Sequence, residues 1–224
     1  MGHDVVEDVG HGSGGAGPAG DEPDRAREFT RCAQSVGLLS SARLRFKAQS
    51  GKGGRLAKVG LLADSHGRAV TTDRAVHALL DRGVDRLIHL GDIGTVEVID
   101  ALAVDLPGGD DQIEAHLVFG NTDWDIEGLS DYARDLDVSV DHPLGTLRLP
   151  EGVLAYCHGH EPGVMQAAIR DGVTWLCHGH THRASDLRRG GTRVINPGAL
   201  FRAAHYTVAV LDTASDSVEM IDVG

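Results

Sequence analysis

The chain has 224 residues, of which 41% are hydrophobic, and its formal net charge at pH 7 is −12. This size allows one domain with a buried core, and no stretch approaches the roughly 18 consecutive apolar residues of a membrane-spanning helix. The acidic charge argues against a broad nucleic-acid-binding face. The odd number of cysteines, three, argues against a disulfide framework and favours the reducing cytoplasm.

The charge pattern divides the chain near residue 56. Residues 1–24 contain six acidic residues and no Lys or Arg, whereas residues 25–55 contain eight basic residues and one acidic residue. The first segment is rich in glycine and poor in large apolar side chains, which predicts disorder, and it lacks the pattern of a secretory signal. The second is either a short basic amphipathic helix or a solvated tail. We expect residues 1–55 to be an N-terminal extension and residues 56–224 to be the folded domain.

Strand and helix patterns alternate after this boundary. In chain order they predict a strand over 56–64, a helix over 71–83, a strand over 84–92, a helix over 95–108 and a strand over 113–121. Gly83 is expected to end the first of these helices. Such an order is typical of an α/β fold in which helical crossovers join parallel strands.

The second half of the chain, after about residue 140, is rich in strand patterns. The prediction is a hairpin around 150–152, a helix near 162–171, and strands over 173–177, 184–188, 192–196, 205–212 and 217–222. We expect these strands to be mostly antiparallel. An alternating first half and a strand-rich second half, within one domain, fit two sheets packed together with helices outside.

Polar residues gather where the predicted strands end. They are Asp64, His66, Asp92, Asn121, His158, His180 and His182. In open α/β sheets this edge is where ligands bind, because its loops stand on a rigid scaffold. We therefore expect these side chains to meet and form a functional site.

The residues Cys-His-Gly-His occur twice, at 157–160 and at 177–180. Two cysteines and two histidines suggest a zinc site, but the Cys-x-x-Cys spacing typical of structural zinc is absent. Successive side chains of a strand point to opposite faces, and free cysteine is among the most buried residue types. We predict that Cys157 and Cys177 are core residues and that the neighbouring histidines carry the function.

The gathered polar residues offer two carboxylates, one amide and four imidazoles, without a thiolate. Mixed oxygen and nitrogen ligation suits Mn²⁺, Fe²⁺, Zn²⁺ or Ni²⁺ better than Mg²⁺ or Ca²⁺. Seven ligands exceed the need of one tetrahedral ion, whereas two ions about 3.5–4 Å apart that share a carboxylate would use them all. The expected cofactors are two divalent metal ions, with Mn²⁺ preferred.

The motifs follow one another as Asp-x-His (64–66), Gly-Asp (91–92), Gly-Asn (120–121), the first Cys-His-Gly-His, and Gly-His-Thr-His (179–182). In this order they resemble the calcineurin-like metallophosphoesterase superfamily. With Gly-Asn-Thr-Asp (120–123) and Asn-Pro-Gly-Ala (196–199), they look most like its small YfcE-type phosphodiesterases. The resemblance covers about residues 56–212. It implies a four-layer αββα sandwich of two mixed β-sheets flanked by helices, with a dinuclear metal site at one end.

The resemblance also implies a role for each ligand position. It assigns Asp64, His66 and His182 to the first metal ion, Asp92 to both, and Asn121, His158 and His180 to the second. His160 has no firm counterpart, and we expect it to face the substrate or to support the ligands. It joins Asp92 and Asn121 as a candidate catalytic residue. The other histidines without motif context, His77, His89, His116, His142 and His205, are expected to be structural.

One position departs from the pattern of many superfamily members. They follow the motif Asn with a His that protonates the leaving group, and an Asp orients that His. Thr122 and Thr95 stand at these positions, so the general acid is unassigned. The YfcE-type subgroup also lacks this His, so its absence does not argue against activity.

The expected function is hydrolysis of phosphodiester bonds in small substrates, by a hydroxide that two metal ions generate and that attacks phosphorus in line. A phosphomonoesterase acting on a nucleotide or phosphoprotein is the main alternative. A non-catalytic scaffold like the retromer subunit of this fold is less favoured, because all seven ligand positions are intact. A metallo-β-lactamase-like hydrolase is disfavoured because its His-x-His-x-Asp-His run is absent. We expect a small phosphoester as the partner, a cytoplasmic protein, and no membrane attachment; a homo-oligomer is compatible with the sequence.

Overall fold

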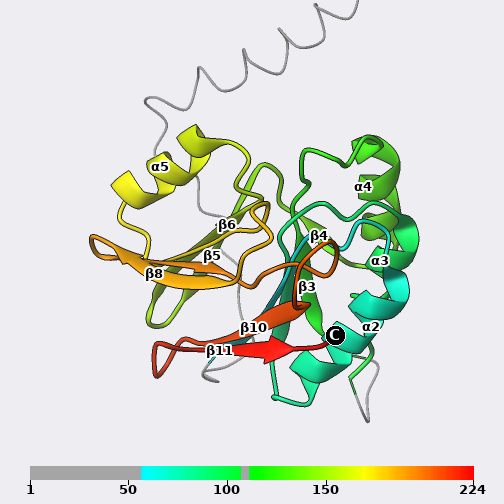
Figure 1. Ribbon diagram of the computed structural model, residues 1–224, viewed down its shortest axis with the longest axis horizontal. Helices are drawn as coiled ribbons and strands as arrows, with labels where there is room; N and C mark the ends of the chain where they lie inside the picture. The colour runs from blue at the N-terminus through cyan, green and yellow to red at the C-terminus, as the bar shows by residue number, and fades with distance from the viewer. Residues whose placement is uncertain (1–56, 107–110) are drawn as a thin grey trace, which may run out of the picture. The chain divides into compact units, whose positions relative to one another are not determined.

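A computed structural model describes the protein over residues 57–106 and 111–224, and Figure 1 shows how the elements are arranged. The strands of the first sheet are β1 (Lys58–Leu62), β2 (Arg86–His89), β3 (Glu114–Leu117), β4 (Ser139–Val140), β10 (Thr207–Asp212) and β11 (Ser217–Asp222). Their order is β11-β10-β1-β2-β3-β4. The predicted N-terminal extension, residues 1–55, lies outside the described residues.

The second sheet has five strands in the order β5-β6-β7-β9-β8. They are β5 (Leu144–Leu149), β6 (Gly152–Cys157), β7 (Trp175–Cys177), β8 (Ser185–Arg189) and β9 (Thr192–Asn196). The helices are α2 (Ala69–Leu80), α3 (Val96–Asp100), α4 (Ile126–Asp135) and α5 (Pro162–Arg170). No helix in the described part of the chain is long and apolar enough to span a membrane.

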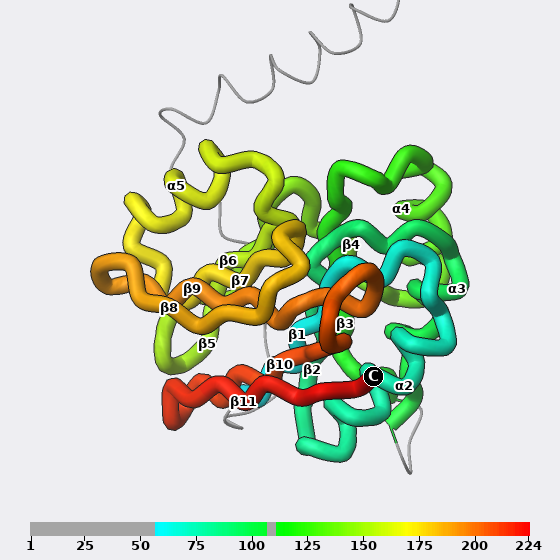
Figure 2. The backbone as a smooth tube through the Cα atoms, viewed as in Figure 1, coloured from blue at the N-terminus to red at the C-terminus, as the bar shows by residue number. Residues whose placement is uncertain are grey.

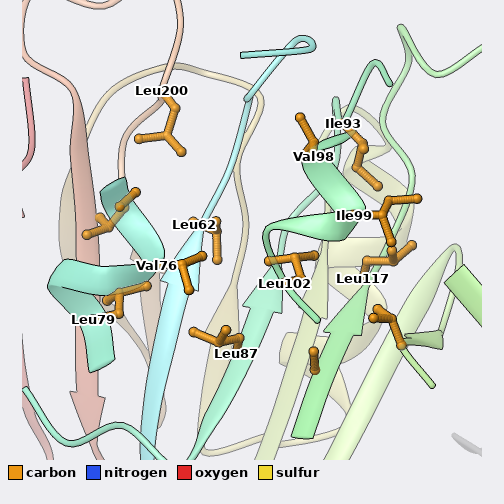
Figure 3. Packing of buried hydrophobic residues seen from close by; sticks show 14 of the residues in the cluster. Leu62, Val76, Leu79, Leu87, Ile93, Val98, Ile99, Leu102, Leu117 and Leu200 are labelled. Carbon is orange, nitrogen blue, oxygen red and sulfur yellow. The ribbon is translucent and has the colours of Figure 1, made fainter. Parts of the chain in front are cut away.

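Buried side chains form three layers of core that fix the stacking of these elements. One cluster packs α2, α3 and α4 against the first sheet, with Leu62, Leu87 and Leu117 on the sheet side (Figure 3). A second fills the space between the two sheets, and a third packs α5 on the outer face of the second sheet. The result is the predicted αββα sandwich of two mixed sheets.

Strand β1 shows how the sequence produces two packed faces. Its side chains alternate, so that Val59 and Leu61 enter the core between the sheets while Leu62 packs toward the helices. All three are fully buried. A strand that is buried on both faces needs a nearly continuous apolar run, which is the pattern found in this part of the sequence.

Both cysteines of the repeated motif are free and buried, at 2% exposure for Cys157 and 0% for Cys177. Cys157 packs with α5, and Cys177 packs between the two sheets. Burial raises the pKa of the Cys157 thiol to about 12 and also raises the pKa of Cys177. The prediction that these residues belong to the core is confirmed.

Most strand pairs of the second half are antiparallel, as predicted, but the centre of the second sheet is parallel. Strands β6, β7 and β9 run parallel at the centre of the second sheet. The helix α5 connects β6 to β7, and a crossover of this kind returns the chain to the same end of the sheet. Antiparallel pairs form at its margins, including the predicted hairpin in which Leu149 faces Gly152. The C-terminal strands, orange to red in Figure 2, return to the first sheet beside β1.

Three further elements differ from the prediction. The helix predicted over 95–108 is only the short α3, because the backbone N–H of Ile113 donates to the carbonyl of Val104 at 2.9 Å and holds the following segment extended. Helix α4 and strand β4 were not predicted. The signals for α4 were present: Asp125 caps it by accepting a hydrogen bond from the N–H of Gly128 at 3.0 Å.

Candidate metal centre

The predicted polar residues lie in the loops that follow β1, β2, β3, β6 and β7, where two sets of parallel strands end. Backbone hydrogen bonds join these loops within each sheet: the N–H of His66 donates to the carbonyl of Asp92 at 2.9 Å. A further bond crosses between the sheets, since the N–H of His180 donates to Asp64 Oδ2 at 3.1 Å. The two sheets therefore present their loops to one common site.

The backbone is strained at the predicted ligands. Among the described residues, eight non-glycine residues have a positive φ. Five of them are predicted ligands: Asp64 (56°), His66 (44°), Asp92 (55°), His180 (67°) and His182 (55°). This region of φ is costly for residues with a Cβ, and such strain is concentrated at functional sites.

Two glycines provide the space that the converging side chains occupy. A Cβ at Gly120 would lie 2.0 Å from Asp92 Oδ1, and one at Gly91 would lie 2.7 Å from His158 Nδ1. Gly91 also has a φ of 97°, which disfavours any other residue. These glycines allow the Asp92 and His158 side chains to approach the neighbouring backbone closely.

Two groups of three side chains bring their ligand atoms within 4.8 Å of one another: Asp64, His66 and His182, and Asp64, Asp92 and His158. Asp64 belongs to both groups. Asp92 Oδ2 lies 3.5 Å from His66 Nε2 and 3.5 Å from His158 Nε2, so Asp92 also faces a histidine of each group. Two carboxylates thus lie between the histidines of the two groups.

The two other predicted ligands lie at the margin of this cluster. Asn121 Oδ1 is 3.2 Å from His158 Nε2. The ring of His180 is centred 5.1 Å from that of His158, but His180 belongs to neither of the two groups found in the described chain. Both residues therefore border the group that contains His158.

His160 lies beside the cluster rather than within it. Its ring is centred 5.3 Å from His158, and its Nδ1 is buried without a hydrogen-bond partner in the described structure. Its Nε2 is 3.5 Å from Glu161 Oε1. A small open pocket of about 10 Å³, room for about one water molecule, adjoins it and is lined by residues that include Pro143, Glu161 and Val164. His160 is thus placed to contact a molecule that occupies this pocket.

Burial and neighbouring charges set the protonation of the carboxylates. Burial raises the pKa of Asp64 to about 6. Burial also opposes ionisation of Asp92, but hydrogen bonds with His158 and with the N–H of Thr122 outweigh it and hold its pKa below the usual range. Near neutral pH both carboxylates are therefore mainly ionised, which is the form that binds a cation.

The histidines of the cluster are not all alike. Burial lowers the pKa of His66 and of His180, so their imidazoles are neutral and able to act as ligands. Burial also disfavours protonation of His158, but its hydrogen bond with Asp92 outweighs this effect and raises its pKa. His158 is consequently the imidazole of the site that is most strongly tied to a carboxylate.

Several supporting residues were not identified from the sequence as parts of the site. His89, predicted to be structural, is fully buried below the loops. Its Nδ1 accepts from the N–H of Gly91 at 3.2 Å, and its Nε2 lies 2.8 Å from Ser65 Oγ. Burial lowers its pKa to about 3, so it stays neutral. His89 therefore joins the loop of Asp64 to the loop of Asp92.

Asp123 and Asn196 hold other loops of the site in place. The carboxylate of Asp123 accepts hydrogen bonds from the N–H groups of Gly94 and Gly120, both at 2.8 Å. Asn196 Nδ2 donates to the carbonyl of Gly179 at 2.8 Å. Both residues belong to the quoted motifs, so the sequence contained a signal for their importance, although it did not indicate their contacts.

Two stacked sheets with helices outside, and an Asp and His cluster at the ends of their parallel strands, are typical of metal-dependent phosphoesterases. Residues 57–216 match the calcineurin-like phosphoesterase superfamily domain, and the chain belongs to this family. The predicted family, and with it the assignment as a phosphoesterase, is confirmed.

Known proteins share both sequence and fold with the chain. It is 24% identical over 162 residues to the phosphodiesterase MJ0936 of Methanocaldococcus jannaschii, an alignment that covers 70% of this chain and 93% of that protein. Its structure resembles that of an archaeal phosphodiesterase, with a TM-score of 0.65, 24% identity, and coverage of 74% of this chain and 99% of that one. The phosphoesterase YfcE from E. coli gives a TM-score of 0.52 at 19% identity, covering 75% of this chain and 100% of its own.

Proposed function

We propose that this centre hydrolyses phosphodiester bonds of small substrates with two divalent metal ions, of which Mn²⁺ is the preferred one. The observation that carries the proposal is a pair of three-residue groups, each with its ligand atoms within 4.8 Å, together with Asp92 Oδ2, which lies 3.5 Å from a histidine of each group. The similarity to the phosphodiesterase MJ0936 favours a diester over a monoester.

The residues fit metal ions in number and in chemistry. Each group combines imidazole nitrogen with carboxylate oxygen, as Mn²⁺, Fe²⁺ and Zn²⁺ prefer. His66 Nε2 is buried without a hydrogen-bond partner in the described structure, which is costly for a polar atom unless a ligand satisfies it. We assign Asp64, His66 and His182 to one ion.

The second ion would be held by His158, His180 and Asn121, and Asp92 would be shared by both ions. Bound metal ions would supply Lewis acidity, which activates water as a nucleophile and neutralises charge on the phosphoryl oxygens.

The protein's own contribution is to hold these ligands in fixed orientations. His158 Nδ1 lies 2.8 Å from the carbonyl of Leu90 and donates to it, so Nε2, which faces the cluster, is the nitrogen that would bind a metal ion after losing its proton. The N–H of Thr122 donates to Asp92 Oδ1 at 3.0 Å and leaves Oδ2 toward the histidines. The site is thus arranged before a metal or a substrate arrives.

Residues near the open side of the site would contact the substrate. We assign His160 to a contact with the substrate at the open side of the site, because its Nδ1, which has no partner among the described residues, needs a hydrogen bond. Thr122 occupies the position of the usual proton-donating His, and its Oγ1 is 3.4 Å from His66 Nδ1. A threonine hydroxyl is a poor acid, so we expect substrates with good leaving groups to react fastest.

The test combines metal analysis with a substrate comparison. Purified protein, stripped with a chelator and reconstituted with Mn²⁺, should hold two ions and hydrolyse bis(p-nitrophenyl) phosphate faster than p-nitrophenyl phosphate. His182→Ala should lose metal and activity. His205→Ala is the matched control, because His205 is exposed and pairs with Asp222 at 3.2 Å. Faster hydrolysis of the monoester would favour the phosphomonoesterase alternative, and a chain without bound metal would refute the proposal.

A further inference from the structure

An aromatic and cationic cluster adjoins the proposed metal centre. The ring of Phe201 is centred 5.1 Å from that of His66. Two guanidinium groups lie over the same Phe201 ring, with Arg68 Cζ 4.8 Å and Arg202 Cζ 5.0 Å from its centroid. We call Arg68, Phe201 and Arg202 the arginine cluster.

The backbone holds this cluster against the loops that bear the ligands. Leu200 is fully buried, and its N–H donates to the carbonyl of Ala63 at 3.2 Å, one residue before Asp64. Arg202 has a φ of 48°, a strained conformation for a residue with a Cβ. Strain of this kind persists only where the surrounding structure enforces it. The fold therefore fixes the backbone conformation at Arg202.

Neither arginine of the cluster forms an ion pair with a carboxylate within residues 57–106 and 111–224. Other arginines do: Arg82, Arg86, Arg134, Arg188 and Arg193 each lie within 4.0 Å of an acidic side chain. Acidic residues outnumber Lys and Arg by about two to one after residue 56. Arg68 and Arg202 therefore place two positive charges, without a carboxylate partner among the described residues, beside the site of an acidic domain.

The contact with Phe201 leaves both cations able to bind an anion. A guanidinium that lies over an aromatic ring retains N–H donors that can pair with phosphate oxygens. Two neighbouring guanidinium groups favour a dianionic phosphate over a group with a single negative charge.

We propose that the arginine cluster is a subsite for a second phosphate group, so that the substrate is a phosphodiester that also carries a phosphate monoester. This inference rests on the proposed function: the metal centre holds the scissile phosphate, and the cluster holds the other. Because both arginines lie over Phe201, whose ring in turn adjoins His66, we place the second phosphate on another part of the substrate and not on the scissile phosphorus.

Two matched substrates test the subsite. Thymidine 5′-(p-nitrophenyl phosphate) has a neutral 3′-hydroxyl, and its 3′-phosphorylated counterpart differs only by the second phosphate. For the Mn²⁺-loaded full chain we expect the 3′-phosphate to raise kcat/KM about tenfold, which corresponds to about 1.4 kcal/mol. In the double variant Arg68→Gln/Arg202→Gln this ratio should fall to near one. Arg170→Gln, the same charge change at the exposed end of α5, should keep the full ratio.

A binding measurement separates this inference from the catalytic proposal. Calorimetric titration should show thymidine 3′,5′-bisphosphate binding about tenfold more tightly than thymidine 5′-phosphate to the wild-type chain, and equally tightly to the double variant. Hydrolysis of neither nitrophenyl ester would refute the proposed function while the titration still tests the subsite. Hydrolysis of both esters with a ratio near one, or an unchanged ratio in the double variant, would overturn the inference alone.

Discussion

Asp123 holds together the two loops that carry Asp92 and Asn121, so its removal should weaken both the fold and the site. In Asp123→Ala, two N–H groups lose their acceptor. The N–H of Gly120 is buried, and leaving it unpaired costs about 1–3 kcal/mol. Gly94 is exposed, so water can replace the lost bond and the cost there is about 0.5–1.5 kcal/mol. We expect the free energy of unfolding to fall by the sum of these two costs, about 1.5–4.5 kcal/mol.

Urea unfolding of the metal-free protein measures this loss directly. Asp125→Ala is the matched control, because Asp125 also accepts a backbone hydrogen bond but is exposed, and losing a helix N-cap costs about 1 kcal/mol. Asp123→Asn keeps one of the two acceptor oxygens and should fall between wild type and Asp123→Ala. In Mn²⁺ titrations, Asp123→Ala should bind more weakly than Asp125→Ala. An equal loss of stability in the two alanine variants would refute the reasoning.

The remaining predictions concern a ligand, the core, a buried imidazole and the N-terminal extension. Asp92→Asn should slow diester turnover more than Asn121→Ala, because Asp92 faces both groups of ligands; equal rates would contradict a shared ligand. Cys177→Ser should lower the free energy of unfolding by about 1 kcal/mol or more without loss of metal on elemental analysis, since it buries a hydroxyl in the core. Loss of metal with Cys177 would contradict a structural role. Burial opposes protonation of His116, but hydrogen bonds with two carboxylates outweigh it and raise its pKa above the usual value. The stability advantage of wild type over His116→Gln should therefore be full below about pH 6.5 and be lost as pH rises through the folded-state pKa. Urea unfolding at several pH values measures this difference, and a constant value would contradict it. A chain that begins at Gly51 should fold, bind metal and keep diesterase activity within about threefold of the full chain; insoluble protein would place the domain boundary earlier.

The local sequence determined much of the fold and the composition of the candidate site. Strand β1 was predictable because its apolar run is continuous, and α2 because its apolar residues recur at helical spacing. The burial of Cys157 and Cys177 followed from the alternation of side chains along a strand. The candidate ligands could be selected because the motifs that carry them each follow a predicted strand and include a glycine, a pattern visible in neighbouring residues.

Tertiary structure decided the features that depend on residues far apart in the chain. Helix α3 is short because the N–H of Ile113 donates to the carbonyl of Val104 and keeps that segment extended. The centre of the second sheet is parallel because α5 forms a crossover between β6 and β7. Asp123 became a support of the site only where the ends of β2 and β3 came together. The arginine cluster needed residues from two loops more than 130 positions apart to meet on one ring. A local pattern encodes which face of an element is apolar, but it does not encode which distant loop will meet that face, because that choice is set by the packing of the whole core.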